Sequence, residues 1–228
     1  MPRKGTIHAG SRDDHPGFKL VFRSRLCHTN EGMEHVDDKP RCEWALQDPL
    51  YRRYHDEEWG LPHHDDRLLF EFLILEGMQA GLSWLTVLRK RENFRRAFSD
   101  FVPEKIAAYG ERHIQTLMSD SGIIRNRRKI EAAIVNARMF LKVQSEKITF
   151  DSFIWRFAPE SRSRNPRKSI ADIPAQTPES REMSRILRIR GFKFVGPTIC
   201  YAFMQAVGMV NDHTEDCFRY REIEALSL

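Results

Sequence analysis

The chain lacks a run of about 18 or more apolar residues, and its first residues lack the basic-then-apolar order of a signal peptide. We therefore expect no membrane span and a cytoplasmic protein. It has only 4 cysteines, too few for the disulfide framework of a small secreted domain. No alternating strand pattern persists and no repeat period is present, which disfavours sheet folds and repeat folds.

Apolar residues and basic charge are both plentiful. Hydrophobic residues make up 41% of the 228 residues, which is enough to build the core of one domain or two small ones. The net charge is +5 and the pI is near 9.1. This surplus favours a polyanionic partner, although charge alone specifies neither a fold nor a sequence preference.

The chain divides into an N-terminal extension and a helical domain. Residues 1–38 are rich in charge, glycine and histidine without sustained periodicity, so we expect a mobile extension followed by one domain over 39–228. Prolines, serines and charges predict a loop at 159–178. Apolar residues recur at spacings of three and four in six segments: 67–78, 83–98, 126–143, 150–157, 179–190 and 196–207. The sequence therefore predicts an all-α bundle of short helices.

Two pairs of metal-binding residues stand near the two ends of this domain. Twelve residues separate Cys42 from His55, and three separate His213 from Cys217, so the second pair shares one helical face. Two cysteines and two histidines make a tetrahedral zinc site without an open position. The pattern predicts one structural Zn²⁺ that ties the chain ends together, and it leaves the chemistry to the residues between them.

The segment 67–78 is apolar on nearly every face but carries two glutamates. Glu71 lies one turn from Arg67 and is expected to pair with it, whereas Glu76 lies about 140° further round the helix. The two carboxylates cannot share one narrow solvated stripe, so Glu76 faces the core or a pocket, where a carboxylate is retained for function. A glutamate at the rim of the helix end, paired with an arginine, would show the same pattern.

Aromatic residues are concentrated around His55 and just after Glu76: Trp44, Tyr51, Tyr54, Trp59 and Trp84. A flexible turn with an apolar tip, at Gly81 and Leu82, precedes the last of them. Aromatic faces beside one carboxylate suit a flat, positively charged ring, through stacking, cation–π attraction and a charge-assisted hydrogen bond. Each aromatic residue can equally be an ordinary part of the core.

A second informative segment, 187–200, predicts two helices joined by a short turn. The first helix ends at Gly191 and the next opens at Gly196, where exposed amides can hold a phosphate oxygen. This pattern matches a helix-hairpin-helix, which grips a DNA backbone, and we expect four residues to contact DNA: Gly191, Lys193, Gly196 and Thr198. Basic clusters at 185–193 and 125–129 also favour nucleic acid. An ordinary helical corner with solvated charges would show the same features.

With these residues identified, the chain resembles the DNA-3-methyladenine glycosylase I family, within the helix-hairpin-helix glycosylases, over roughly 41–217. The resemblance rests on four blocks: RCEWALQDPLYRRYHDEEWG, FEFLILEGMQAGLSWLTVLRKRENFR, SGIIRNRRKI and RGFKFVGPTICYAFMQAVGMVNDH. It implies excision of 3-methyladenine from alkylated double-stranded DNA, and we expect a monomer. It also implies the four zinc ligands given above, a DNA wedge at Gly81 and Leu82, and a base pocket formed by Trp44, Tyr51, Tyr54, Glu76 and Trp84.

Two differences from the wider superfamily constrain the mechanism. Asn211 stands where many members carry a catalytic aspartate, with Asp212 shifted by one position, and Pro197 and Thr198 stand where lyase members carry a lysine. The resemblance therefore implies a monofunctional enzyme that leaves the abasic site uncut, with Glu76 as the catalytic or base-recognising carboxylate. Two alternatives stay open: a strand-cleaving glycosylase for oxidised bases, and a zinc-containing DNA-binding module without catalysis.

Overall fold

The structure, a computed structural model, describes residues 37–161 and 166–226. Within these ranges the chain is helical, and the only strand-type pairing is an isolated bridge between Arg167 and Thr214. The ten α-helices there are α1 (Pro49–Glu57), α2 (Asp66–Gln79), α3 (Trp84–Ala97), α4 (Pro103–Ala107), α5 (Glu111–Ser119), α6 (Arg127–Ser145), α7 (Phe150–Trp155), α8 (Pro178–Ile189), α9 (Pro197–Ala206) and α10 (Phe218–Ala225). Three short 3-10 helices join them: η1 (Glu43–Gln47), η2 (Ser99–Phe101) and η3 (Ile170–Asp172). The all-α prediction is confirmed.

The six helices predicted from periodicity are all present, and their ends lie within two residues of the predicted ends. Side-chain caps explain several of these ends, because Ser83, Asn126 and Thr177 each accept a hydrogen bond from a backbone N–H in the first turn. Helices α1, α4, α5 and α10, each of nine residues or fewer, were not predicted from periodicity. The predicted loop at 159–178 contains η3.

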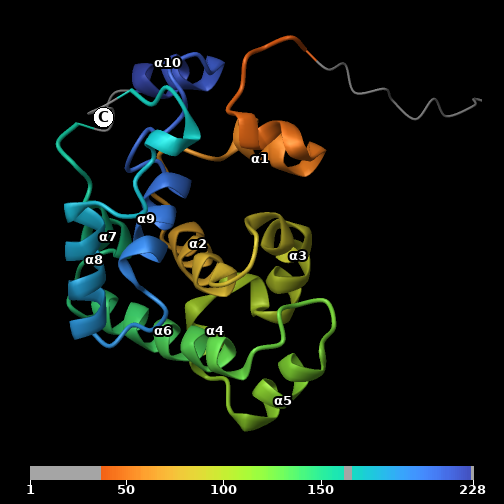
Figure 1. The fold of residues 1–228 in the computed structure, drawn as a ribbon. Helices are drawn as coiled ribbons and strands as arrows, with labels where there is room; N and C mark the ends of the chain where they lie inside the picture. Colours follow the sequence, from red (N-terminus) through yellow and green to blue (C-terminus); the bar gives the residue numbers. More distant parts are fainter. Residues whose placement is uncertain (1–36, 162–165, 227–228) are drawn as a thin grey trace, which may run out of the picture. The chain divides into compact units, whose positions relative to one another are not determined.

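Helix α2 lies between α3 and α9, and it also contacts α6 and α7 (Figure 1). Every residue from 69 through 78 is buried, as the all-round apolar character predicts. Because other helices surround α2, Glu76 lies inside the protein, close to the C-terminal end of this helix.

The expected pairing of Glu71 with Arg67 is wrong. Glu71 instead accepts hydrogen bonds from α3, from Arg91 Nε at 2.6 Å and Arg95 Nε at 3.1 Å. Arg91 also donates two parallel bonds to Glu58, at 2.6 and 2.7 Å. The buried carboxylate takes these partners because α3 packs on the face of α2 that carries it, and a buried charge requires a close partner of opposite sign. The network fixes the position of α3 against α2.

Contacts group Asp38–Leu228 into one unit. The predicted mobile extension, residues 1–38, lies outside the described ranges except for its last two residues, so it stays a prediction. In the part of the chain that the structure describes, no helix is both long enough and apolar enough to cross a membrane.

Candidate functional site

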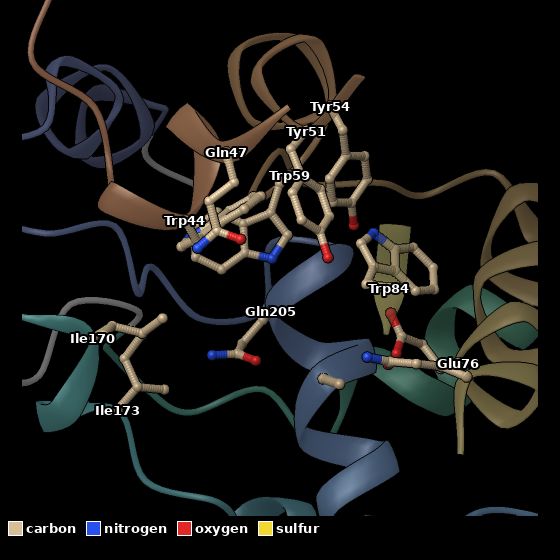
Figure 2. A pocket seen from close by; sticks show the side chains of 12 residues that line it. Trp44, Gln47, Tyr51, Tyr54, Trp59, Glu76, Trp84, Ile170, Ile173 and Gln205 are labelled. Atoms are coloured by element: carbon tan, nitrogen blue, oxygen red, sulfur yellow. The ribbon is translucent and has the colours of Figure 1, made fainter. Parts of the chain in front are cut away.

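A cavity of about 340 Å³ lies beside Glu76, with walls from η1, α1, α2, the start of α3, η3 and α9. The volume falls in the range of about 300–1,000 Å³ that is typical of small-ligand sites. All five residues predicted to form a base pocket line it: Trp44, Tyr51, Tyr54, Glu76 and Trp84 (Figure 2). The structure therefore brings together side chains that come from four separate helical segments, η1, α1, α2 and α3.

The aromatic rings form an edge-to-face cluster around the cavity. Trp44 meets Tyr51 at a centroid distance of 5.4 Å and Trp59 at 5.1 Å, with interplanar angles of 86° and 84°. Tyr54 and Trp84 are 5.6 Å apart. These contacts fix the ring orientations without filling the cavity, because the edge-to-face arrangement leaves faces available for stacking. The aromatic residues thus serve both the core and the cavity wall.

Among the described residues that line this cavity, Glu76 is the only acidic one. It is 4% exposed, and within the described residues its Oε2 has no hydrogen-bond partner and no arginine pairs with it. The alternative of a rim glutamate paired with an arginine is therefore wrong. Burial raises the pKa of Glu76 to about 8, so the side chain is largely protonated at neutral pH. A ligand with N–H donors or positive charge would favour the ionised form.

The turn between α2 and α3 presents an apolar side chain at the edge of this cavity. Gly81 has a φ of +80°, a left-handed conformation that favours glycine. The Leu82 N–H donates to the Gln79 carbonyl at 2.6 Å, and the Leu82 side chain is 43% exposed. Gln79 before the turn and Trp84 after it both line the cavity. Leu82 is therefore exposed directly beside the cavity.

Helices α8 and α9 pack against each other and are joined by the turn 190–196. Gly191 has a φ of +96°, and Gly196 is the N-cap of α9, where no side chain caps the helix. Lys193 and Thr198 are exposed. Asn136 of α6 anchors the turn, since its amide accepts from the Lys193 N–H at 2.7 Å and donates to the Lys193 carbonyl at 3.0 Å. The two predicted helices joined by a short turn are present, and Asn136 holds the turn between them.

The basic cluster at 125–129 is not a uniform solvated patch. Arg127 forms ion pairs with Glu111 and Glu131. Lys129 is 7% exposed, and its ammonium group donates to two backbone carbonyls at the end of α2. The expectation that Lys129 belongs to a nucleic-acid-binding surface is wrong, because this side chain points into the protein.

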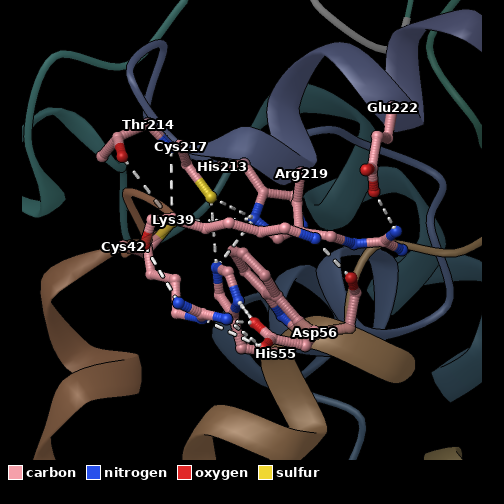
Figure 3. A network of polar contacts seen from close by, with 11 residues as sticks. Lys39, Cys42, His55, Asp56, His213, Thr214, Cys217, Arg219 and Glu222 are labelled. Atoms are coloured by element: carbon pink, nitrogen blue, oxygen red, sulfur yellow. Dashed lines mark hydrogen bonds and ion pairs between the residues drawn. The ribbon is translucent and has the colours of Figure 1, made fainter. Parts of the chain in front are cut away.

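The four predicted metal ligands come together in one buried cluster: Cys42, His55, His213 and Cys217 (Figure 3). His55 Nε2 lies 3.2 Å from His213 Nδ1, and the nitrogen-to-sulfur distances between neighbouring ligands are 3.4, 3.6 and 3.7 Å. Zinc bonds of about 2.0 Å to nitrogen and about 2.3 Å to sulfur imply about 3.3 Å between nitrogens and about 3.5 Å between nitrogen and sulfur in a tetrahedron. The donor set fits a tetrahedral metal ion.

Groups behind the ligands orient them for metal binding. His55 Nδ1 is 2.8 Å from Asp56, and His213 Nε2 is 3.2 Å from the Trp59 carbonyl, so each imidazole keeps its other nitrogen for the cluster. Burial lowers the pKa of His213, which favours the neutral, metal-binding form. The Thr214 N–H donates to Cys42 Sγ at 3.4 Å, which stabilises a thiolate there.

Asp212, one position after the place of the superfamily aspartate, does not face the cavity. It is 4% exposed and accepts hydrogen bonds from Arg167 Nε at 3.0 Å, Tyr201 Oη at 2.5 Å and Gln205 Nε2 at 2.8 Å. Gln205 itself lines the cavity, which no sequence pattern predicted. The one signal that could have indicated it is a polar side chain within the apolar helix α9. The bonds to Asp212 support the cavity wall and leave Glu76 as the carboxyl group that faces the cavity.

Solved structures that share this fold are DNA glycosylases. The crystal structure of a 3-methyladenine DNA glycosylase I is 51% identical in sequence, with a TM-score of 0.76, and the match covers 78% of this chain and 98% of that one. A variant of a 3-methyladenine DNA glycosylase I in complex with 3-methyladenine is 35% identical, with a TM-score of 0.74, over 78% of this chain and 96% of that one. Fold and site together define a helical DNA glycosylase.

The chain belongs to the methyladenine glycosylase family, whose sequence model matches residues 44–220. It is 50% identical over 180 residues to DNA-3-methyladenine glycosylase 1 of Escherichia coli K12, and the match covers 79% of this chain and 96% of the relative. The family resemblance inferred from the four sequence blocks is thereby confirmed.

Proposed function

We propose that this protein is a monofunctional DNA glycosylase that hydrolyses the N-glycosidic bond of 3-methyladenine in double-stranded DNA and leaves an abasic site. The observation that carries the proposal is Glu76, a buried carboxyl group whose Oε2 has no partner, facing an aromatic cavity. A flat base with a formal positive charge and an amino group suits both features, because the rings can stack on it and the carboxylate can accept its N–H groups.

The chemistry of the lesion sets what the protein has to do. Methylation at N3 gives the adenine a formal positive charge, so its departure from deoxyribose neutralises the base and needs no general acid. Recognition and extrusion therefore carry most of the selectivity, and flipping costs about a few kcal/mol, least for a weakly paired base. In this proposal Leu82 enters the duplex, the extruded base stacks on Trp84, and Glu76 accepts hydrogen bonds from the adenine edge.

The proposed DNA grip lies at the turn between α8 and α9. The uncapped N-terminus of α9 at Gly196 offers backbone N–H groups to a phosphate oxygen, and Gly191 lets the backbone approach closely. The exposed Lys193 and Thr198 add a positive charge and a hydroxyl donor. These features support a helix-hairpin-helix that holds the DNA backbone without reading its sequence.

The absence of a lyase nucleophile supports a monofunctional enzyme. Among the described residues, no lysine lines the cavity, and Pro197 and Thr198 occupy the first turn of α9 where lyase members carry one. The described residues of the cavity therefore offer the strand-cleaving alternative no amine that could form a Schiff base with the sugar. A monomeric state and a cytoplasmic location stay predictions.

We also propose that Cys42, His55, His213 and Cys217 hold one Zn²⁺. When bound, the ion has four protein ligands and no position for an activated water, so it supplies structure and no chemistry. The ligands join the segment before α1 to the segment before α10. The metal would thereby secure the wall that carries Trp44 and Tyr51.

Base release from methylated duplex DNA tests the proposed activity. Free bases are separated by chromatography, and the DNA is assayed for strand breaks before and after alkali. Free 3-methyladenine with breaks only after alkali is expected, and breaks before alkali would indicate a lyase. Release of no base by folded, metal-loaded protein would instead support the DNA-binding module.

A Glu76→Gln variant separates enzyme from binding module. The amide cannot ionise, so selectivity for the methylated base or the rate of release should fall, whereas a pure binding module would hold undamaged duplex equally well with either residue. Glu92→Gln, on an exposed part of α3, is the matched control. Unchanged rate and selectivity in Glu76→Gln would remove Glu76 from the mechanism.

A further inference from the structure

A buried lysine holds the start of the turn that carries Leu82. Lys129, the third residue of α6, donates from Nζ to the Met78 carbonyl at 2.8 Å and to the Ala80 carbonyl at 2.7 Å. Met78 lies in the last turn of α2, and Ala80 is the residue that ends the helix. The ammonium group therefore spans the end of α2, where the chain leaves the helix to form the turn.

A helix end needs such a partner, because its last carbonyls have no N–H donors within the helix. A cation there also compensates the negative end of the helix dipole. Burial of the charge is unfavourable and lowers the pKa of Lys129. Burying a neutral side chain at this position would therefore cost less free energy. The lysine supplies what an apolar residue cannot, which is several N–H donors on one atom directed at two carbonyls.

The two carbonyls flank Gln79, whose own carbonyl accepts the Leu82 N–H at 2.6 Å. Three consecutive peptide units are therefore fixed where the turn begins. Beyond them the tip has little support of its own. Among the described residues outside 80–82, no heavy atom lies within 4 Å of the position that a Cβ on Gly81 would take, and Leu82 is 43% exposed. The conformation of Leu82 at the tip therefore depends on how the start of the turn is held.

We propose that Lys129 is a positioning residue for the DNA wedge: by holding the end of α2 it keeps Leu82 in the conformation that enters the duplex, without touching DNA or base. This inference rests on the proposed function. A turn that is already ordered does not have to be ordered when it meets DNA, which favours insertion. Loss of Lys129 should therefore impair extrusion of the base more than binding of the base in the cavity.

The competing explanation is that Lys129 only stabilises the fold, and α6 offers a matched control. Arg138 lies nine residues further along the same helix, and it also donates to two backbone carbonyls, those of Ala107 at 3.0 Å and Tyr109 at 3.5 Å. Lys129→Met and Arg138→Met each remove a cation that holds two carbonyls. Only the first lies beside the turn that carries Leu82.

The experiment compares wild type, K129M and R138M in three measurements. These are single-turnover release of 3-methyladenine from methylated duplex, binding of free 3-methyladenine by tryptophan fluorescence, and the fluorescence of 2-aminopurine beside an abasic-site analogue, which reports unstacking of the duplex. K129M should slow base release by about 10-fold to 100-fold and reduce the 2-aminopurine signal, with free-base affinity close to that of wild type. R138M should resemble wild type in all three.

The double variant K129M/L82A gives a further test, because residues that act through one another have non-additive effects. Once Lys129 is removed, Leu82→Ala should slow release little further. If K129M does not fold, Lys129→Gln, which keeps one amide donor, takes its place.

Three outcomes would overturn the inference: normal release in K129M, a parallel loss of free-base affinity, or fully additive effects of K129M and L82A. A wild type that releases no base would overturn the proposed function, whereas the 2-aminopurine signal would still show whether Lys129 controls insertion of Leu82.

Discussion

Replacing Glu76 with glutamine should raise the free energy of unfolding near neutral pH, and the gain should grow as the pH rises. Burial raises the pKa of this carboxyl to about 8 in the folded protein, from an ordinary value of 4.5. Between these two values the unfolded chain has lost a proton that the folded protein still holds, so raising the pH favours unfolding. Glutamine does not titrate, and the variant should lack this pH dependence.

The magnitude follows from the two pKa values. One pKa unit corresponds to about 1.4 kcal/mol, so the full shift sets a limit of about 5 kcal/mol above pH 8, of which about 3 kcal/mol is reached by pH 7. Solvent screening reduces this little, because Glu76 is only 4% exposed.

Urea unfolding of wild type, E76Q and the surface control E92Q at several pH values between 5 and 8 measures the effect. The difference between E76Q and wild type should be small at pH 5 and widen steadily towards pH 8, while E92Q stays parallel to wild type. A constant difference between E76Q and wild type across this range would refute the assignment of Glu76 as a buried, protonated acid. A stabilised E76Q with slower base release would show that the carboxyl group is retained for function at the expense of stability.

Three further predictions concern the metal, the cavity and the DNA grip. His213→Ala, or removal of the metal by a chelator, should lower Tm by at least about 6 °C in a thermal scan, because a four-ligand clasp between the chain ends is lost; an unchanged Tm would refute the clasp. Trp84→Ala should weaken binding of free 3-methyladenine by about 1–3 kcal/mol in a calorimetric titration, because a stacking face is lost, and unchanged affinity would place the base elsewhere. Lys193→Ala should weaken binding to duplexes of any sequence and reduce the slope of log K against log salt by about 1; a slope equal to that of wild type would remove Lys193 from the phosphate contacts.

Much of the fold and of the candidate site could be predicted from the sequence. Periodicity located the six helices because apolar residues recur at spacings of three and four in each of them, including the six-residue α7. Ligand chemistry and spacing selected the four residues of the metal cluster, and the structure confirms that they meet. Glu76 could be predicted to face the interior because no solvated stripe on its helix could hold both glutamates.

The partners of buried charges could not be predicted in the same way. Glu71 was assigned to Arg67 because the two are neighbours on one helix, yet its partners come from α3, twenty or more residues further along the chain. Lys129 was assigned to a basic surface because its sequence neighbours are basic, yet it points at the end of α2. Local spacing shows which residues are adjacent on one helix, whereas the packing of different helices decides which charges meet.

Helix α6 supports both of the turns that are proposed to contact DNA. Lys129 on this helix holds the turn that ends in Leu82, and Asn136 holds the turn between α8 and α9. The two supports are seven residues apart on one continuous helix, or about 10 Å along its axis. If the two turns contact DNA as proposed, this helix sets the distance between Leu82 and the phosphate-binding turn, and neither turn has to set it alone. In the proposed complex, the spacing between the point of insertion and the bound phosphate would be fixed by the fold before any DNA is bound.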